Sequence, residues 1–278
     1  MWEIKLYRKM KKETYSEYKA VEKLSILEIQ KMFSIYEKYY QNTAISIFTS
    51  DLSEKTGVFL IREPINDYIV GFSTITERDF EVNSKRIVGF FSGDTVIEAE
   101  YWGSRALQRA MFRYVIEFKI RHFFQPVYWL LISKGFKTYL LMANNFNHYY
   151  PHPDGQDQHL NELIKAYSIK YYGEYYDHKT ALINFGESYQ ALKSDVAPIT
   201  EEMKINNRKI AFFEQSNPTW EQGTELPCIA EIRWLYVWQE AFNVLKKFKK
   251  NSKGVLDRPN QQIANVIQVD DADKSKAA

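Results

Sequence analysis

The sequence predicts an α/β protein whose mixed central sheet is flanked by helices, with a mainly helical extension toward the C-terminal end. Strand-like apolar runs and amphipathic helical stretches follow one another over residues 25–145. Their order is helix, helix, three strands, helix, strand, helix. Strands joined by short connections form a meander, whereas the helix before the last strand indicates a crossover. This combination is typical of a mixed sheet between helices.

The two N-terminal helices are predicted from local signals. Ser25 and Glu28 form a capping box, and apolar side chains recur three and four positions apart up to Tyr39. A shorter helix is expected from Thr43 to about Glu54. The preceding residues 11–23, rich in Lys, Glu and Tyr, are interpreted as a solvated helix.

Runs of β-branched and aromatic residues predict the strands. A hairpin connection at residues 63–67 joins the first two, and Gly93-Asp94 interrupts the third as a bulge or a turn. One helix crosses from the third strand to the fourth, and another follows it. The expected strands are Val58–Arg62, Tyr68–Thr76, Arg86–Phe91 with Thr95–Ala99, and Val127–Ser133, and the expected helices are Ala106–His122 and Phe136–Asn145.

Beyond Pro153 the pattern is mainly helical. Helices are expected over Gln158–Tyr171, from Pro198 to about Glu214 and over Ile229–Lys250, with a strand pair in the aromatic stretch before Phe185. The sequence shows no internal repeat and no flexible linker. We therefore expect a domain over residues 1–185, a helical extension over 186–252 packed on it, and a disordered tail over 253–278.

Composition excludes several classes of protein. A formal net charge of +2 gives no general reason to expect nucleic acid as a partner. Cys228 is the only cysteine, which excludes a disulfide framework and a cysteine zinc site. No apolar run is long enough for a transmembrane segment or typical of a signal peptide, so a cytoplasmic protein is expected. The 16% aromatic content indicates either a Tyr-rich core and surface or a pocket lined by rings.

The turn before the predicted helix Ala106–His122 is the most informative segment. Trp102, Gly103, Ser104 and Arg105 connect the third predicted strand to this helix. A strand that feeds a turn and then a helix leaves backbone N–H groups unpaired at the helix start. These groups form a site for phosphate or another anion.

The order of elements from Ser25 to Pro153, together with the segment Glu100–Leu107, resembles the GNAT acyltransferase superfamily. In that family the fourth strand splays from the fifth, and the pantetheine arm of an acyl-CoA pairs with strand backbone in the gap. The pyrophosphate lies on the turn that follows. Gly103 falls on a family glycine, whereas Trp102 stands where Arg is common. The resemblance implies that the thioester donor contacts Ala99, Trp102, Gly103, Ser104, Arg105, Ala106, Ser133 and Asn145.

The turn departs from the family pattern at Arg105 and Leu107, where small residues are expected. Because these side chains crowd a diphosphate, either CoA is bound in an altered way or the donor carries a single phosphate. Acyl-phosphopantetheine on an acyl carrier protein is such a donor, and acyl-homoserine-lactone and N-acyl amino acid synthases are similar in using it. Arg105, Arg109 and Arg113 recur every four residues, as either an ordinary solvated face or a docking stripe for an acyl carrier protein.

The resemblance also implies the chemistry. An amine attacks the thioester directly while a base takes its proton and an acid, often Tyr, protonates the leaving thiolate. Glu98 and Glu100 lie where the family often places the base, with Glu98 as the first candidate, and Tyr150 is the candidate acid. The two carboxylates could equally be exposed groups near a helix N-terminus. We therefore expect an N-acyltransferase that moves a medium or long acyl chain to a small amine. The alternative is a GNAT-shaped protein that binds an acyl carrier or a lipid-like ligand without catalysis.

A histidine-rich segment is the rival site. His148, His152 and His159 lie close together in sequence, with Asp154 and Asp157 among them. Imidazole and carboxylate are suitable metal ligands. However, two prolines and a glycine interrupt the segment, so no helical face presents the ligands together. A polar surface loop is expected there, and no metal.

Overall fold

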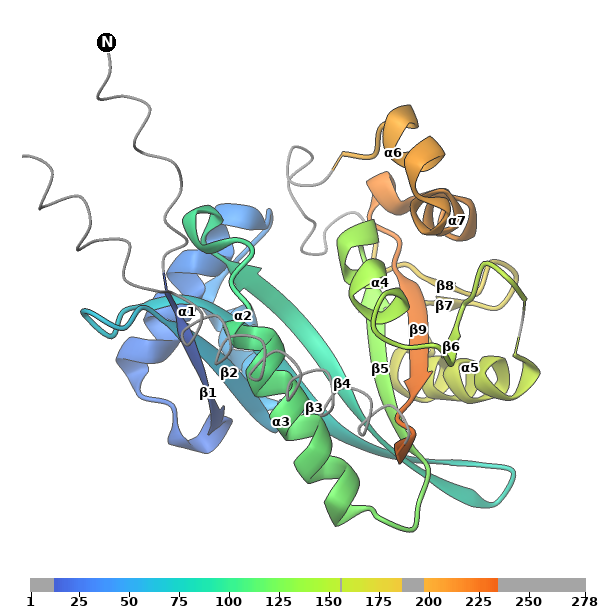
Figure 1. Ribbon diagram of the computed structural model, residues 1–278, viewed down its shortest axis with the longest axis horizontal. Helices are drawn as coiled ribbons and strands as arrows, with labels where there is room; N and C mark the ends of the chain where they lie inside the picture. Colours follow the sequence, from blue (N-terminus) through green and yellow to red (C-terminus); the bar gives the residue numbers. More distant parts are fainter. Residues whose placement is uncertain (1–12, 156, 187–197, 235–278) are drawn as a thin grey trace, which may run out of the picture. The chain divides into compact units, whose positions relative to one another are not determined.

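A seven-stranded mixed sheet organises the part of the chain that the computed structural model describes, which comprises residues 13–155, 157–186 and 198–234. The strand order is β1-β2-β3-β4-β5-β9-β6 (Figure 1). Neighbouring strands are antiparallel except β4 and β5, which are parallel. The strands are β1 Tyr15–Ala20, β2 Gly57–Arg62, β3 Ile69–Val82, β4 Lys85–Ile97, β5 Val127–Ser133, β6 Tyr149–Tyr150 and β9 Leu226–Glu231.

The helices follow the predicted order. Ser25 and Glu28 form the predicted capping box, in which the Glu28 amide donates to Ser25 Oγ and the Ser25 amide donates to Glu28 Oε2. The region predicted as one helix from Pro198 to Glu214 is two helices separated by Asn207. The helices are α1 Ile26–Tyr39, α2 Ile45–Ser53, α3 Ala106–Arg121, α4 Phe136–Ala143, α5 Gln158–Tyr172, α6 Glu201–Asn206 and α7 Arg208–Ser216.

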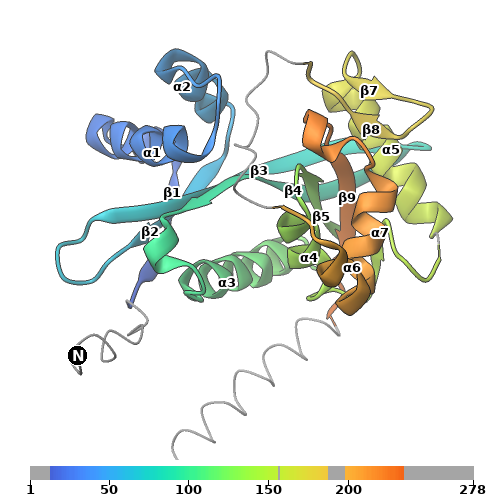
Figure 2. The same cartoon turned by 90° about the horizontal axis from the view of Figure 1, so that it is seen from above.

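The helices lie on both faces of the sheet. α1 and α2 cover one end of one face, α5 covers the other end of the same face, and α3 lies on the opposite face (Figure 2). The α1–α2 core includes Phe72 of β3, and the α5 core includes Phe80 of the same strand. α3 contributes Tyr114 and Phe118, whose rings meet Phe90 on the opposite face. The arrangement confirms the predicted α/β fold, a mixed central sheet flanked by helices.

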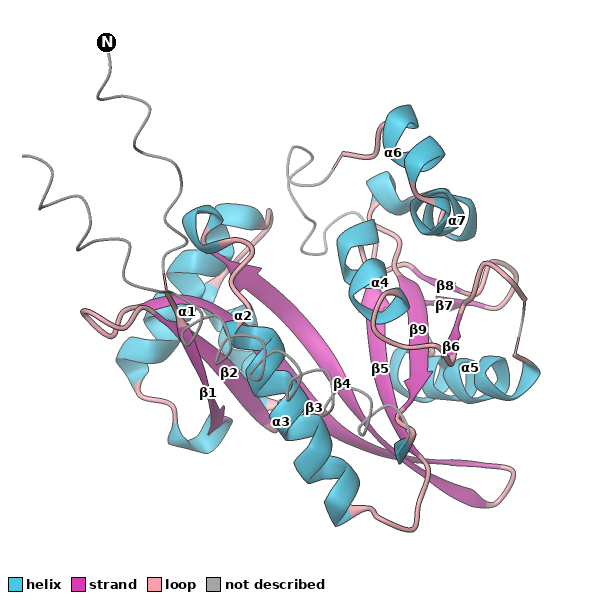
Figure 3. Cartoon of the chain, viewed as in Figure 1, coloured by secondary structure: helices cyan, strands magenta, loops and turns pink. Residues whose placement is uncertain are grey.

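Two predictions of helix were wrong where the structure forms strands (Figure 3). Tyr15–Ala20 is the edge strand β1, because an edge strand tolerates charged residues on its solvent-facing positions. Leu226–Glu231 is β9, which overlaps the start of the helix expected over Ile229–Lys250. This strand is buried between β5 and β6, and such strands are continuous apolar runs without alternation.

The first compact unit ends at Ile232, and β9 is part of its central sheet. The described part of the extension predicted over residues 186–252 therefore contributes the interior strand β9 as well as α6 and α7. The second unit begins at Arg233 and lies almost entirely outside the described residues. The rest of the closing helix and the tail expected over 253–278 lie there too. A small second sheet, β7 Tyr176–Asp177 with β8 Leu182–Ile183, supplies the strand pair expected before Phe185.

Candidate functional site

The parallel strands β4 and β5 pair only briefly and then separate. Their register runs from Val88 opposite Val127 to Phe91 opposite Leu130. Beyond Phe91, β4 remains paired with β3, whereas β5 remains paired with β9. Within the described sheet, the edge of β4 that faces β5 therefore has no partner strand from Ser92 to Ile97.

A β-bulge lies at the point of separation. Ser92 faces Ile75 and Thr95 faces Ser73, so β4 has one residue more than β3 in this interval. The extra residue falls at Gly93-Asp94, where the sequence predicts a bulge or a turn. A bulge turns the side chains that follow it toward the other face and increases the local twist. Asp94 lies in this bulge, close to the point where β4 leaves β5.

Two further charged side chains reach the same gap from β5 and β9. Lys134 directly follows β5, and Glu225 directly precedes β9. Because Ser133 pairs with Leu226, these two residues occupy the next paired position, and Lys134 Nζ lies 3.4 Å from Glu225 Oε1. The Glu225 backbone is fixed by hydrogen bonds of 2.9 and 3.0 Å with Ile183 of β8. The residue is 1% exposed.

The environment of this gap cluster, Asp94, Lys134 and Glu225, favours the neutral form of its acids. Burial raises the pKa of Glu225 to about 7, the Lys134 ammonium opposes this shift, and the charge of Asp94 adds to it. Burial also raises the pKa of Asp94, with Lys134 opposing and Asp51 of α2 adding. A carboxyl group with a pKa near neutrality can take a proton at physiological pH.

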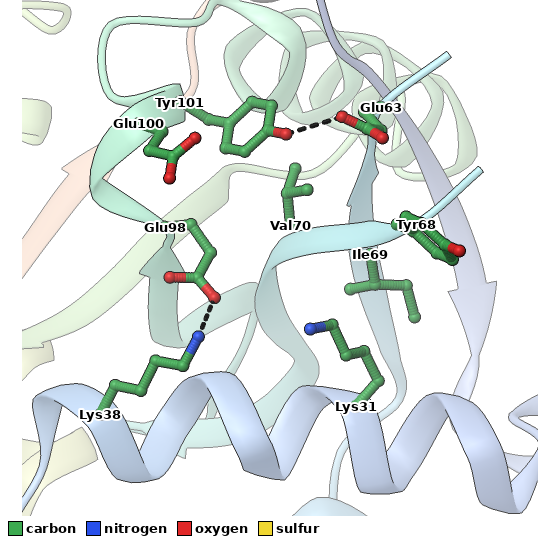
Figure 4. Close-up of a pocket in the computed structure, with 9 residues that line it drawn as sticks. All are labelled: Lys31, Lys38, Glu63, Tyr68, Ile69, Val70, Glu98, Glu100 and Tyr101. Atoms are coloured by element: carbon green, nitrogen blue, oxygen red, sulfur yellow. Dashed lines mark hydrogen bonds and ion pairs between the residues drawn. The ribbon is translucent and has the colours of Figure 1, made fainter. Parts of the chain in front are cut away.

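The first predicted base, Glu98, lies in a separate cavity of about 490 Å³ beside α1 (Figure 4). Its carboxylate forms an ion pair with Lys38 of α1, and its backbone amide donates to Val70 O at 2.9 Å. Opposite, the Tyr101 hydroxyl donates to Glu63 Oε2 at 2.7 Å. The lining residues are Lys31, Lys38, Glu63, Tyr68, Ile69, Val70, Glu98, Glu100 and Tyr101.

Glu98 and Glu100 both line this cavity, although neither belongs to β4. β4 ends at Ile97, and Ala99–Tyr101 forms a short 3-10 turn. The Ala99 amide donates to the Tyr39 hydroxyl of α1 at 3.0 Å, which ties the turn to the helix. The strand predicted to reach Ala99 is therefore two residues shorter.

The predicted donor turn leads into α3 as expected. Gly103 adopts a left-handed φ of 83°, which other residues rarely adopt. The Ala106 amide, the first of the helix, donates to Ser104 Oγ at 3.1 Å. Within the described residues, the next amides, of Leu107 and Gln108, have no hydrogen-bond partner. They point out of the helix start, where an anion binds most readily.

Trp102 and Arg105 frame this turn. The Trp102 indole donates to Ile97 O at 2.8 Å, and its ring lies 5.0 Å from Lys137 Nζ of α4. Arg105 is exposed and precedes the helix as its N-cap without a side-chain cap. With Arg109 and Arg113 it forms the predicted stripe, and within the described residues none of the three makes an ion pair.

The remaining predicted residues are dispersed. Ser133 is fully buried and donates to Gly135 O at 2.8 Å, next to Lys134 at the gap. Asn145 donates to Leu141 O at 2.6 Å, beyond the end of α4. Tyr150 belongs to β6, three places from β4 in the sheet, so its backbone is at least about 14 Å from that strand. It lines another cavity, of about 440 Å³, and is not brought to Glu98.

The histidine-rich segment does not gather around one point. His148 contacts two carboxylates, Asp157 Oδ2 at 2.6 Å and Glu231 Oε2 at 2.8 Å. His152 Nδ1 accepts from the Asp154 amide at 3.0 Å. Among the described residues no group of three or more such side chains is arranged to hold a metal ion.

No helix among those described is long and apolar enough to cross a membrane.

The gap cluster was missed by sequence reasoning. The sequence predicts Gly93-Asp94 only as an interruption of a strand, although a carboxylate within an apolar run is itself a signal of a functional group. Lys134 at the end of a buried strand was a second signal. Glu225 could not be paired with them because no strand is predicted after it and the helix expected from Ile229 covers the second half of β9.

Comparison with known proteins gives likenesses of fold only. No protein-family model matches the sequence, and no curated protein matches it. Among solved structures, the chain is similar to a probable N-acyltransferase from Enterococcus faecalis, at 15% identity over 46% of this chain and 31% of that one, with a TM-score of 0.36. It is similar to a GNAT family N-acetyltransferase from Escherichia coli in complex with CoA, at 8% identity over 49% of this chain and 69% of that one, with a TM-score of 0.34. It is also similar to a bacterial toxin, at 12% identity over 51% of this chain and 86% of that one, with a TM-score of 0.35. The first likeness spans less than a third of that protein's length.

Proposed function

We propose that this protein is an N-acyltransferase that moves an acyl group from a thioester donor to a small amine by direct attack. The observation that carries the proposal is the separation of β4 from β5 at a bulge, with a buried carboxyl group of pKa about 7 beside it. Proton abstraction from an amine needs a base whose pKa lies near the working pH. Glu225 meets this requirement.

The donor has a binding route along β4. The strand edge from Ser92 to Ile97 offers backbone groups to an extended, amide-containing arm such as pantetheine, in the manner of an added strand. The same strand leads to the turn at Gly103 and to the amides of Leu107 and Gln108 at the start of α3. A phosphate attached to that arm would accept hydrogen bonds from these amides.

The gap cluster supplies the reaction chemistry. The amine nitrogen forms a bond with the thioester carbonyl carbon, the carbon–sulfur bond breaks, and sulfur leaves with the bonding pair as a thiolate. Glu225 takes the proton that the nitrogen loses. Lys134, 3.4 Å from Glu225, places a positive charge where the oxygen and then the sulfur become negative. Glu98 with its Lys38 partner remains the rival base, and Tyr150 requires a rearrangement to serve as the acid.

The arginine stripe favours an acyl carrier protein as the donor. Arg105, Arg109 and Arg113 are exposed on one side of α3, beside the predicted phosphate site. An acidic carrier would be steered to this stripe, whereas free acyl-CoA needs only the turn. The aromatic content of the core supports a medium or long acyl chain.

One observation favours the non-catalytic alternative. The ion pair between Lys38 and Glu98 occupies the carboxylate that stands where the family often places its base. A protein that binds an acyl carrier or lipid-like ligand needs no free base there. Donor binding without product across a broad amine panel would establish this alternative.

The test compares matched carboxylate variants. Glu225→Gln, Glu98→Gln and the exposed α3 control Glu117→Gln are assayed for thiol release and amide product with acyl-CoA and acyl carrier donors. We expect Glu225→Gln to lower kcat by about a hundredfold or more, with Glu117→Gln unchanged. Loss of turnover in Glu98→Gln alone would transfer the role of base to Glu98.

A further inference from the structure

A second cavity, of about 440 Å³, lies at the end of the sheet that carries β9 and β6. The helices α5 and α7, the strand β6, the β7–β8 turn and the start of β9 surround it (Figure 1). Its lining shares no residue with the gap cluster or with the Glu98 cavity. Sites for small molecules have volumes of roughly 300–1,000 Å³, so this cavity is large enough to be one.

One wall of this cavity is a loop that is held from outside. The loop contributes several residues between positions 151 and 155. The Tyr139 hydroxyl of α4 donates to Pro151 O at 3.1 Å, and Arg208 of α7 donates to Pro153 O at 2.8 Å. These bonds fix the loop against two helices. The wall therefore has its shape before any ligand binds.

The β7–β8 turn forms another wall and contains a strained residue. Ala181 lines the cavity with a left-handed φ of 57°, which residues with a Cβ rarely adopt. Its amide donates to Asp177 O at 2.8 Å, and Thr180 Oγ1 donates to Asp177 Oδ2 at 2.8 Å. Strained backbone conformations are concentrated at functional sites. This turn is thus an independent indication that the cavity binds something.

The charge of the lining favours an anion. It contains no Asp or Glu, whereas Lys165 of α5 supplies an ammonium group that makes no ion pair in the part of the chain that is described. His152 supplies a second donor. Because its Nδ1 accepts from the Asp154 amide at 3.0 Å, the ring carries its proton on Nε2. An ammonium and an imidazole N–H without a carboxylate beside them are suited to hold an anionic group.

Aromatic rings supply the rest of the site. Tyr150, Tyr176 and Phe212 line the cavity from β6, β7 and α7. Neither phenol makes a hydrogen bond within the described ranges, although Tyr176 is only 8% exposed. A buried phenol usually has a partner. Rings that offer both an apolar face and a donor hydroxyl fit a planar ligand with acceptor atoms.

We infer that this cavity binds an organic anion with an aromatic body. Its carboxylate or phosphate is held by Lys165 with His152, and its ring packs against Tyr150, Tyr176 and Phe212. A cationic ligand would be repelled by the ammonium and would find no carboxylate in the lining. The inference does not depend on the proposed acyl transfer, because the two sites share no residue.

The test is calorimetric titration of the full chain with naphthalene probes that differ in charge. The anions are 2-naphthoate and 2-naphthyl phosphate, and the neutral partner of the same shape is 2-naphthamide. We expect the better anion, which identifies the preferred charged group, to bind about tenfold or more tightly than the amide. Decahydronaphthalene-2-carboxylate, the saturated counterpart of 2-naphthoate, should bind about threefold or more weakly than 2-naphthoate. The inference is overturned if neither anion binds, if the amide binds as tightly, or if the saturated acid does.

Variants locate the anion within this cavity. Lys165→Gln keeps most of the side-chain length, so it should leave amide binding unchanged and remove most of the tenfold preference. Lys170→Gln is the matched control, because Lys170 lies on the same helix outside the lining and donates to Asp79 O at 3.1 Å. Tyr176→Phe should weaken the anion severalfold by removing one hydroxyl. Thermal unfolding checks that each variant is folded. A preference that persists in Lys165→Gln, or that falls equally in Lys170→Gln, contradicts the inference.

Discussion

Replacing Glu225 by Gln should remove a pH-dependent cost from the folded state. Burial raises the pKa of Glu225 from its ordinary 4.5 to about 7. Below pH 4.5 the folded and unfolded chains both hold the proton, so the residue has no effect. As the pH rises from about 4.5 to about 7, the unfolded chain loses the proton and the folded chain retains it. Wild-type stability therefore falls through this window and is constant above it.

The magnitude follows from the two pKa values. At roughly 1.4 kcal/mol for each pH unit, the interval from 4.5 to about 7 corresponds to about 3 kcal/mol. Glutamine has no proton to lose, so the stability of Glu225→Gln relative to wild type should rise by up to about 3 kcal/mol between pH 4.5 and pH 8. Other titrating groups are common to both proteins and cancel, apart from Asp94, whose raised pKa depends partly on its neighbours.

Urea unfolding at a series of pH values, followed by circular dichroism, measures this difference. The control is Glu221→Gln, an exposed residue in the turn that precedes β9. Its stability difference from wild type should not change with pH. A difference for Glu225→Gln that is equally independent of pH would show that Glu225 is not held protonated by burial.

Three further changes test other parts of the structure. A chain ending at Glu225, which lacks β9, should be insoluble. A chain lacking only residues 253–278 should express as well as the full chain. If the protein ending at Glu225 is soluble and unfolds cooperatively, β9 is dispensable. Gly93→Ala should destabilise by about 1–3 kcal/mol, because a Cβ there collides with Thr74 Oγ1, and an unchanged thermal midpoint would contradict the bulge geometry. Ser25→Ala should lower the free energy of unfolding by about 1 kcal/mol, because α1 loses its N-cap. The control is Ser50→Ala, at an exposed position. Equal losses of stability in the two variants would show that the cap does not stabilise the protein.

Local signals predicted the local features of the fold. The capping box at Ser25 needs only two residues three positions apart, and the bulge at Gly93-Asp94 needs only a glycine and a carboxylate within an apolar run. The helix α3 and the turn before it follow from periodicity and from Gly103. In each case the deciding interactions lie within one turn or one strand of the chain.

The candidate site depends on contacts that no local pattern contains. Asp94, Lys134 and Glu225 meet only because β9 returns from a distant part of the chain to pair with β5. The strand was missed because its apolar residues continue into a helical period and because Pro227 usually interrupts a central strand. Glu98, by contrast, was chosen from its place after β4, and the structure adds a Lys38 partner that the sequence could not show.

The position of β9 also orders the events of folding during synthesis. β1 to β4 and α3 can assemble as soon as they leave the ribosome, because their partners are close in sequence. One edge of β5 and the whole of β6 have no partner strand until the chain has been synthesised as far as Glu231, where β9 ends. During that interval the nascent chain exposes an apolar strand edge, which is the kind of surface that chaperones bind.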